Sequence, residues 1–215
     1  MNIALDHVTL GAATLEAGAA HLRQELGIEM APGGAHPHMS THNRVLNVGE
    51  TRFLELLAVD PDAAAPPRRR WFGMDDPAMI ARLAERPRAV GWVLRTDDIQ
   101  RLRDASAVDL GAVTPMSRGS RSWKLTVRDD SMMPFSGLVP AFIEWSEGPH
   151  PADAMPFLGP VLSAVELRHP QADRLRDVLE ALGAASFATV RQDDAGPSMA
   201  FVFRLADGSL RTLGR

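Results

Sequence analysis

The stretch Thr-Arg-Phe-Leu-Glu-Leu-Leu, residues 51–57, places one carboxylate, that of Glu55, inside an otherwise apolar run. A strand turns successive side chains to opposite faces, so Phe53, Glu55 and Leu57 share one face. Burying an ionised carboxylate is costly unless a cation, a metal or hydrogen-bond donors compensate for it. The pattern therefore predicts a strand that directs Glu55 into a polar site.

A second strand of the same kind is expected at residues 141–145, Ala-Phe-Ile-Glu-Trp. In it, Phe142 and Glu144 share one face, while Ile143 and Trp145 share the other. Two such strands in equivalent positions indicate one polar site to which Glu55 and Glu144 both contribute.

The elements around these two strands repeat in the order βαβββ. The first set comprises a strand at 3–10, a helix at 15–26 and strands at 28–30, 44–48 and 51–57. The second set comprises a strand at 89–95, a helix at 99–105 and strands at 113–117, 122–128 and 140–146. A third set follows, with Ala164 where the first has His7 and Arg211 at the position of the carboxylate. We expect a first module at 1–60, a linker with a short helix at 61–88, a second module at 89–147 and a third βαβββ-like module at 158–215.

Composition narrows the class of protein. The chain has 215 residues, 45% of them hydrophobic, which is enough for a sizeable core. The net charge of -4, without a basic patch, disfavours a nucleic-acid partner. The absence of cysteine and tyrosine excludes thiolate and phenol chemistry. No signal peptide or membrane-spanning run is visible, so we expect a soluble cytoplasmic protein without a membrane partner.

Five phrases stand in a fixed order: Leu5-Asp6-His7-Val8, Gly33-Gly34-Ala35-His36-Pro37 leading to Thr41-His42-Asn43, Arg52-Phe53-Leu54-Glu55-Leu56, Gly91 to Asp98, and Pro140 to Trp145. With them the chain, over residues 1 to about 170, resembles the vicinal oxygen chelate superfamily and, within it, the glyoxalase-like domain family of bacterial proteins (glyoxalase, bleomycin resistance and dioxygenase type). The resemblance implies an α+β fold in which paired βαβββ modules form a cupped mixed sheet, with the first and fourth strands of each module side by side.

The resemblance also implies a metal site in the cup. Position by position, it assigns His7 and Glu55 of the first module and Glu144 of the second as ligands. The fourth ligand position falls near Gly91 or Trp92, neither of which offers a good ligand. One histidine and two carboxylates suit a divalent metal such as Mn, Fe, Zn, Ni or Mg. Such a metal would act as a Lewis acid on a substrate with two adjacent oxygens, and Glu144 would carry the proton as the catalytic residue.

The sequence therefore predicts a metal-dependent lyase, isomerase or dioxygenase that acts on a small molecule. The alternative is a metal-free binding protein of the antibiotic-sequestering type, in which the acidic pair binds a cationic ligand. We expect the substrate-binding side chains to be His36, Asn43, Trp92, Trp123 and Phe142.

Simpler explanations exist for each group. A lone strand histidine such as His7 is often structural, and Glu55 and Glu144 could form salt bridges with arginines. The spacing of His36, His38 and His42 matches no closed zinc site. The third module is expected to pack against the paired modules or against its counterpart in a homodimer, since an unpaired curved sheet leaves apolar surface open.

Overall fold

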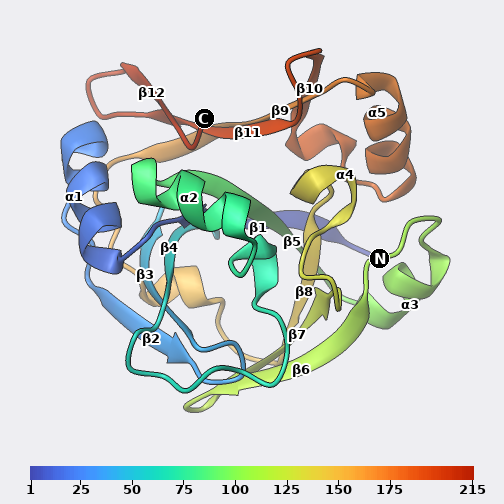
Figure 1. Cartoon of the computed structure of the whole chain (residues 1–215), viewed down its shortest axis with the longest axis horizontal. Coiled ribbons are helices and arrows are strands. Elements are labelled where there is room, and N and C mark those ends of the chain that lie inside the picture. Colours follow the sequence, from blue (N-terminus) through green and yellow to red (C-terminus); the bar gives the residue numbers. More distant parts are fainter.

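A computed structural model describes residues 1–215 (Figure 1). The first module contains β1 (Ile3–Gly11), α1 (Leu15–Leu26), β2 (Pro32–His36), β3 (Thr41–Asn47) and β4 (Phe53–Val59). The second contains β5 (Arg88–Thr96), α3 (Ile99–Ala105), β6 (Ala112–Arg118), β7 (Arg121–Val127), α4 (Pro134–Gly137) and β8 (Ala141–Trp145). The connection between them carries η1 (Trp71–Gly73) and α2 (Pro77–Glu85). The C-terminal part contains η2 (Pro151–Ala154), β9 (Val161–His169), α5 (Ala172–Ala181), η3 (Ala185–Phe187), β10 (Thr189–Gln192), β11 (Ser198–Arg204) and β12 (Leu210–Leu213).

The two modules form one eight-stranded mixed sheet in the order β2-β3-β4-β1-β5-β8-β7-β6. Within each module the first and fourth strands pair in parallel, β1 with β4 and β5 with β8. The modules join where β1 runs antiparallel to β5. The predicted α+β fold of repeated βαβββ modules is confirmed, and β1 and β5 lie at the centre of the curled sheet.

Helix α1 shows how local sequence sets these elements. The Thr14 hydroxyl accepts a hydrogen bond from the Ala17 N–H at the helix start, and Gly27 ends the helix with a φ of 69°. Its buried stripe packs on β4, where Gly18 lies so close to Leu56 that a Cβ would approach it to 2.3 Å.

The C-terminal part has a four-stranded sheet of its own, in the order β10-β9-β11-β12, which lies along one side of the large sheet (Figure 1). Its element order is βαβββ, but its strand pairing differs from that of the first two modules. Here β9 pairs in parallel with β10, the strand that follows its helix, and antiparallel with β11. The sheet is attached through hydrogen bonds from Leu162 N–H to the Val48 carbonyl and from Ala89 N–H to the Gly214 carbonyl.

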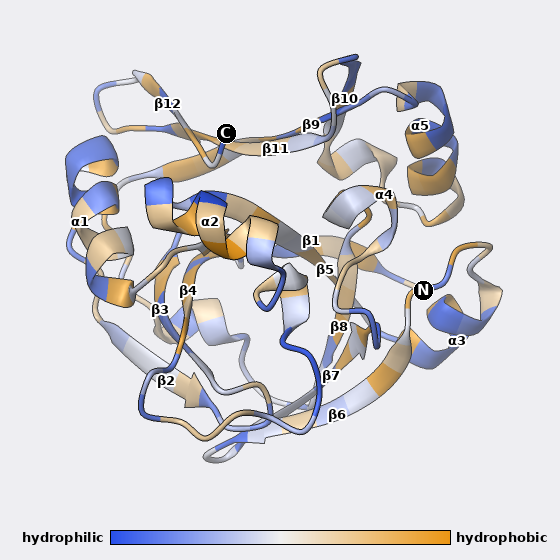
Figure 2. Ribbon diagram, in the orientation of Figure 1, coloured by the Kyte–Doolittle hydropathy of each residue, from blue (hydrophilic) through white to orange (hydrophobic).

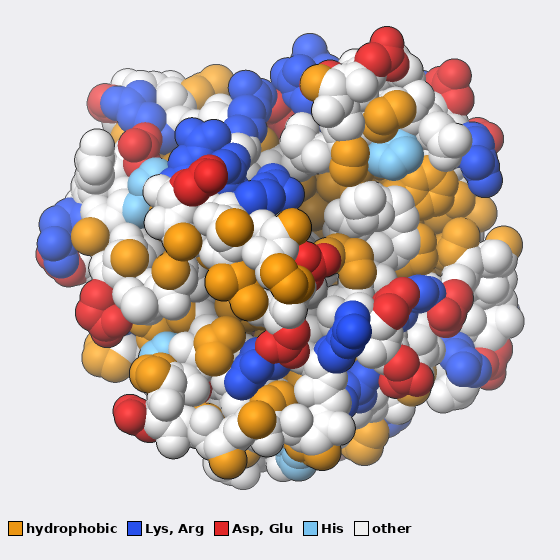
Figure 3. Space-filling model, viewed as in Figure 1, with side chains coloured by type: hydrophobic (Ala, Val, Ile, Leu, Met, Phe, Trp, Pro, Cys, Tyr) orange, Lys and Arg blue, Asp and Glu red, His pale blue; other side chains and the backbone are white.

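One continuous hydrophobic cluster extends from α1 through the central strands to β11. Figure 2 shows hydrophobic segments along β1, β5 and β11, whereas Figure 3 shows basic and acidic side chains mixed over the outer face. No helix of the chain is both long enough and apolar enough to cross a membrane.

One predicted strand lies elsewhere. Residues 28–30 form no strand, although Ile28 and Met30 are buried in the core, and the strand instead covers Pro32–His36. The Gly-rich stretch is therefore part of the sheet edge, and His36 lies at the end of a strand facing Thr41.

Candidate functional site

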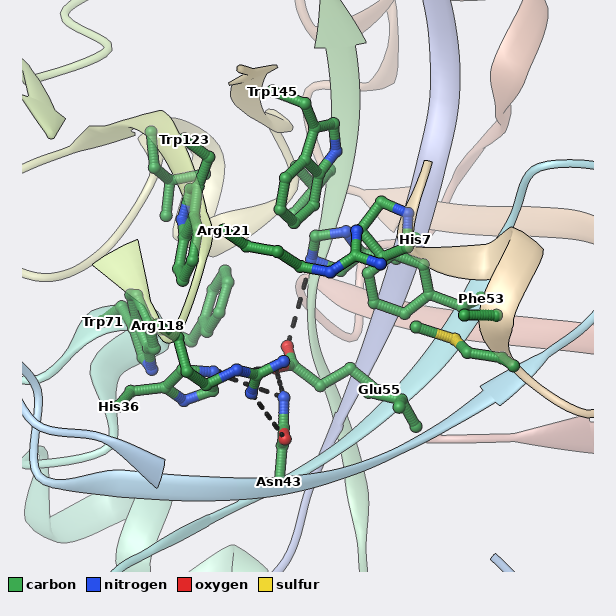
Figure 4. A pocket seen from close by; sticks show the side chains of 17 residues that line it. His7, His36, Asn43, Phe53, Glu55, Trp71, Arg118, Arg121, Trp123 and Trp145 are labelled. Carbon is green, nitrogen blue, oxygen red and sulfur yellow. Dashed lines mark hydrogen bonds and ion pairs between the residues drawn. The ribbon is translucent and has the colours of Figure 1, made fainter. Parts of the chain in front are cut away.

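A cavity of about 240 Å³ lies in the cup of the eight-stranded sheet. The first module supplies a wall that carries His7, His36, Asn43, Phe53 and Glu55. The second module supplies the opposite wall, which carries Arg118, Arg121, Trp123 and Trp145, and both sets of side chains point into the cavity in Figure 4. Trp71 and Phe72 of η1 and residues of η2 close the remaining sides.

Glu55 is the centre of the first wall. It is 7% exposed, and each of its carboxylate oxygens accepts one hydrogen bond, from Asn43 Nδ2 at 2.7 Å and from Thr9 Oγ1 at 3.1 Å. Two imidazoles flank it, since His7 Nε2 lies 3.9 Å from Oε2 and His36 Nε2 lies 3.9 Å from Oε1. The buried carboxylate is therefore compensated by two neutral hydrogen-bond donors, Thr9 and Asn43, as the strand pattern required.

His7 is held by its sequence neighbour. The β1–β5 register shifts between Leu5 and His7, which leaves Asp6 in a bulge and outside the regular alternation of the strand. Asp6 Oδ1 lies 2.6 Å from His7 Nδ1, and the His7 ring stacks on Phe53 with 4.4 Å between ring centroids. Because an ionised carboxylate only accepts hydrogen bonds, His7 Nδ1 carries the hydrogen and Nε2 presents a lone pair to the cavity.

Asp6 is fully buried and has three donors around it. Its second oxygen accepts hydrogen bonds from His150 Nε2 at 2.8 Å and from Trp145 Nε1 at 2.9 Å. Burial alone would raise the pKa of Asp6, but the hydrogen bonds and charges of His150 and His7 outweigh burial and hold the pKa well below its usual range. The Asp6 carboxylate therefore stays ionised and fixes three side chains, one from each side of the cup and one from the connection to β9.

His36 is a neutral member of the site. Burial, opposed in part by the charge of Glu55, lowers the pKa of His36 to about 4. The Asn43 Oδ1 accepts a hydrogen bond from Gly34 N–H at 3.0 Å, so its amide Nδ2 is turned toward Glu55 and lies 3.3 Å from His36 Nε2. His36 Nδ1–H then donates to the Thr41 hydroxyl at 3.2 Å.

Five of the predicted site residues meet in the cavity, namely His7, His36, Asn43, Glu55 and Trp123. Three others do not, and the expected convergence of Glu144 with His7 and Glu55 is wrong. Glu144 points to the opposite face of β8, where it accepts a hydrogen bond from Ile99 N–H at 2.8 Å and pairs with Lys124 Nζ at 2.6 Å. Phe142 shares that face and is fully buried, and Trp92 is fully buried with its N–H bonded to the Leu138 carbonyl.

The position that faces His7 across the module junction is Val93, rather than Gly91 or Trp92. Sequence reasoning missed Asp6 and His150 as site residues, and it missed Arg118, Arg121 and Trp145 as wall residues. One available signal was the pair of arginines on either side of the Gly119-Ser120 turn, because opposed hairpin residues point to the same side.

The cavity residues do not fit a divalent metal in this arrangement. Both Glu55 oxygens and His36 Nε2 face donor groups, and the amide of Asn43 points its hydrogens at the space a cation would need. The second module contributes no ligand, and no group of three or more acidic or histidine side chains is placed to hold a metal ion. Only His7 Nε2 is left free of a hydrogen-bond partner on this wall.

Comparison with solved structures found several matches of low sequence identity. A hypothetical protein from Staphylococcus aureus matches with a TM-score of 0.61 and 15% identity, over 100% of this chain and 86% of its own. Methylmalonyl-CoA epimerase from Mycobacterium tuberculosis matches with a TM-score of 0.43 and 19% identity, over 70% of this chain and 91% of its own. A single-residue variant of the Streptomyces coelicolor methylmalonyl-CoA epimerase, in complex with 2-nitronate-propionyl-CoA, has a TM-score of 0.42 and 16% identity, over 68% of this chain and 98% of its own.

No curated protein matches the chain. The sequence model of one family, described as "Glyoxalase-like domain", matches residues 5–183. That span contains both modules of the cupped sheet except the first residues of β1, and it contains every residue of the cavity walls. The chain belongs to the glyoxalase-like domain family.

Proposed function

We propose that the chain is an enzyme of the isomerase or lyase type, which moves a proton on a carbon next to a carbonyl group of a small substrate with vicinal oxygens. The observation that supports this most is the line Asp6–His7–Glu55, in which His7 Nδ1 is fixed and Nε2 faces the cavity. An imidazole oriented by a buried carboxylate, with its second nitrogen free, is suited to general base catalysis.

The proposed reaction assigns one role to each group. His7 Nε2 takes the proton from the C–H bond, and the electrons of that bond form the C=C bond of an enolate. The charge that develops on the carbonyl oxygen is stabilised by the guanidinium of Arg118, which reaches Asn43 on the far wall at 3.3 Å. Glu55, 3.9 Å from His7 Nε2, stabilises the imidazolium. Where the carbon that lost its proton carries the second oxygen as a hydroxyl, that hydroxyl proton moves to the enolate oxygen and His7 returns its proton to the former carbonyl carbon, which is an isomerisation. Where the next carbon carries a leaving group, the enolate electrons form a new C=C bond and expel that group, which is a lyase reaction.

The hydrogen bonds of the candidate metal ligands favour a metal-free reaction over a metal-dependent one. A dioxygenase reaction requires a redox metal with several protein ligands and open positions. The cavity offers one nitrogen without a partner, while the remaining candidate atoms are engaged by Asn43 and Thr9. Proton transfer needs only the side chains already in place.

Solvent exchange tests the proposal. Phenylpyruvate, hydroxypyruvate and dihydroxyacetone are incubated in D₂O with protein treated with a chelator, and loss of the C–H signals is followed by proton NMR. We expect exchange faster than in buffer, with a drop of about 10²-fold or more in His7→Ala and Glu55→Gln. His38→Gln, at an exposed position of the turn between β2 and β3, is the matched control. Absence of exchange above buffer for all three compounds, in protein that binds at least one of them, refutes the proposal.

The second candidate is a binding protein that sequesters a small molecule. The aromatic wall supports it, since Trp123 and Trp145 lie with ring centroids 5.4 Å apart beside the cavity. A cationic ligand held by two acidic residues does not suit this cavity, because Glu144 lies outside it and two arginines line it. Tight binding without exchange decides for this candidate.

A further inference from the structure

Two arginines face each other at the rim of the cavity. Arg118 ends β6 and Arg121 begins β7, and the two are directly paired across the hairpin. Directly opposed residues of an antiparallel pair point to the same side of the sheet. Both side chains accordingly extend into the cavity toward the wall that carries Glu55 and His7 (Figure 4).

Neither guanidinium is neutralised by the protein. No carboxylate lies within 4.0 Å of either, whereas Arg70 and Arg88 each have one and Arg128 has two. Arg118 donates to the Asn43 Oδ1 and Arg121 to the Pro149 carbonyl, both at 3.3 Å. Like charges directly opposite each other on a sheet destabilise it, so this pair is unfavourable unless an anion lies between or beside the two groups.

The charged side chains on the cavity wall also favour an anionic ligand. The wall contains one carboxylate, that of Glu55, and two guanidinium groups, and His36 is neutral near pH 7. The whole chain carries a net charge of -4. The ionised Asp6 lies behind the wall, where His7, His150 and Trp145 donate to it, so the charges without a matching partner at the cavity surface are those of the two arginines. The arginine rim is thus a local positive region in an acidic protein, which favours an anionic ligand and opposes a cationic one.

The rest of the cavity wall is mainly aromatic. Trp71, Phe72, Trp123 and Trp145 line the cavity together with Phe53. The volume of about 240 Å³ is below the roughly 300–1,000 Å³ that is usual for drug-sized ligands, so the occupant is small. Aromatic walls of this kind pack against a planar apolar group.

We propose that the cavity takes a small carboxylate that bears a planar apolar group and a carbonyl next to the carboxylate, an aryl 2-oxo acid or its equivalent. The assignment of the carbonyl to the His7 side rests on the proposed function. Arg121 binds the carboxylate, Arg118 binds the adjacent carbonyl oxygen, and the tryptophans contact the planar group. The two oxygens of such an acid are vicinal, so one molecule engages both arginines.

Binding of phenylpyruvate and of its methyl ester, which is neutral and has the same body, tests this. Quenching of tryptophan fluorescence reports binding, because three tryptophans line the cavity. We expect the acid to bind at least about tenfold more tightly than the ester. Arg121→Gln should weaken the acid about tenfold or more while changing the ester little, whereas Arg118→Gln should weaken both, because the ester keeps the carbonyl oxygen. Arg211→Gln, on an exposed strand, is the matched control. Equal affinity for acid and ester, or acid binding unchanged in both variants, overturns the proposal.

The same reagents separate this inference from the proposed function. Arginine-dependent binding of the acid without proton exchange supports the ligand class and refutes the enzyme. Exchange of the ester as fast as that of the acid supports the enzyme and refutes the ligand class. His7→Ala tests the two proposals separately, since this variant should still bind the acid but should no longer exchange its proton.

Discussion

The neutral state of buried His36 makes the stability of the protein depend on pH in a defined window. Its pKa is about 4 in the folded protein, against 6.5 for an ordinary histidine, chiefly because of burial. Between these two values the unfolded chain binds a proton at this position and the folded chain does not. Stability therefore falls as the pH is lowered from about 6.5 to about 4, and it is complete above the unfolded pKa.

The size of the effect follows from the two pKa values. Each unit of difference corresponds to about 1.4 kcal/mol, so the full window is worth about 3 kcal/mol. Between pH 7 and pH 5 the expected loss from His36 is about 2 kcal/mol. Asp6 acts lower, because its depressed pKa costs stability only as the pH falls toward and below the ordinary value of 3.8.

Urea unfolding of the wild type and of His36→Gln at pH 7, 6 and 5 measures this dependence. His36→Gln should be less stable at pH 7, because it loses packing against Trp71, but its stability should fall about 2 kcal/mol less between pH 7 and pH 5. The exposed His38→Gln should keep the dependence of the wild type. If the wild type and His36→Gln lose stability in parallel over this range, His36 is not a buried neutral group and the described hydrogen bonds to Asn43 and Thr41 are wrong.

Other parts of the structure make equally direct predictions. Asp6→Asn should lower the free energy of unfolding by about 3 kcal/mol at pH 7, because it leaves a mismatched buried group among three donors. The exposed Asp62→Asn should change it by less than about 0.5 kcal/mol. A small effect of Asp6→Asn in urea unfolding would contradict the three hydrogen bonds described for Asp6. Gly91→Ala should cost about 1–3 kcal/mol, since the new Cβ would lie 2.4 Å from the Phe72 ring, and Gly91→Ala/Phe72→Leu should recover part of that loss in a thermal melt; equal stability of single and double variants would count against this packing. Elemental analysis of protein purified without chelator should find well under one equivalent of Mn, Fe, Zn or Ni, and a full equivalent that disappears in both His7→Ala and Glu55→Gln would restore the metal hypothesis. A chain ending at Gly159 should aggregate or melt earlier, because it uncovers core residues that contact β11, and a soluble truncation with an unchanged midpoint would show that the second sheet is independent.

The paired modules were predictable because their signal is local and repeated. Residues 51–57 and 141–145 each carry a strand pattern that stays the same whatever the rest of the chain does. The pairing of strands inside the C-terminal sheet was not predictable from the sequence, because the order βαβββ does not say which strands are neighbours in the sheet. There β10 returns to lie parallel with β9.

Within the site, alternation placed side chains correctly wherever the strand is regular. Asn43 and Glu55 lie on regular strands, and both reach the cavity. The sequence pattern did not identify Asp6 as a site residue, because the bulge between Leu5 and His7 breaks the alternation and lets the adjacent side chains of Asp6 and His7 contact each other. The bulge depends on how β1 pairs with β5, about ninety residues later in the chain, and the residues at positions 5–7 give no local signal for it.

Glu144 and Trp145 illustrate a different limit. Alternation requires them to lie on opposite faces of β8, but both faces of this strand are covered, so the pattern alone does not say which one is the cup. Helix α3 and strand β7 decide it, because Ile99 N–H of the helix and Lys124 of the strand bind the Glu144 carboxylate on the outer face. The indole N–H of Trp145 instead donates to Asp6 on the inner face. The second module therefore contributes indoles and guanidinium groups and no base. This asymmetry is what the proposed chemistry needs, since a base on one wall can act only on a substrate that the other wall holds against it.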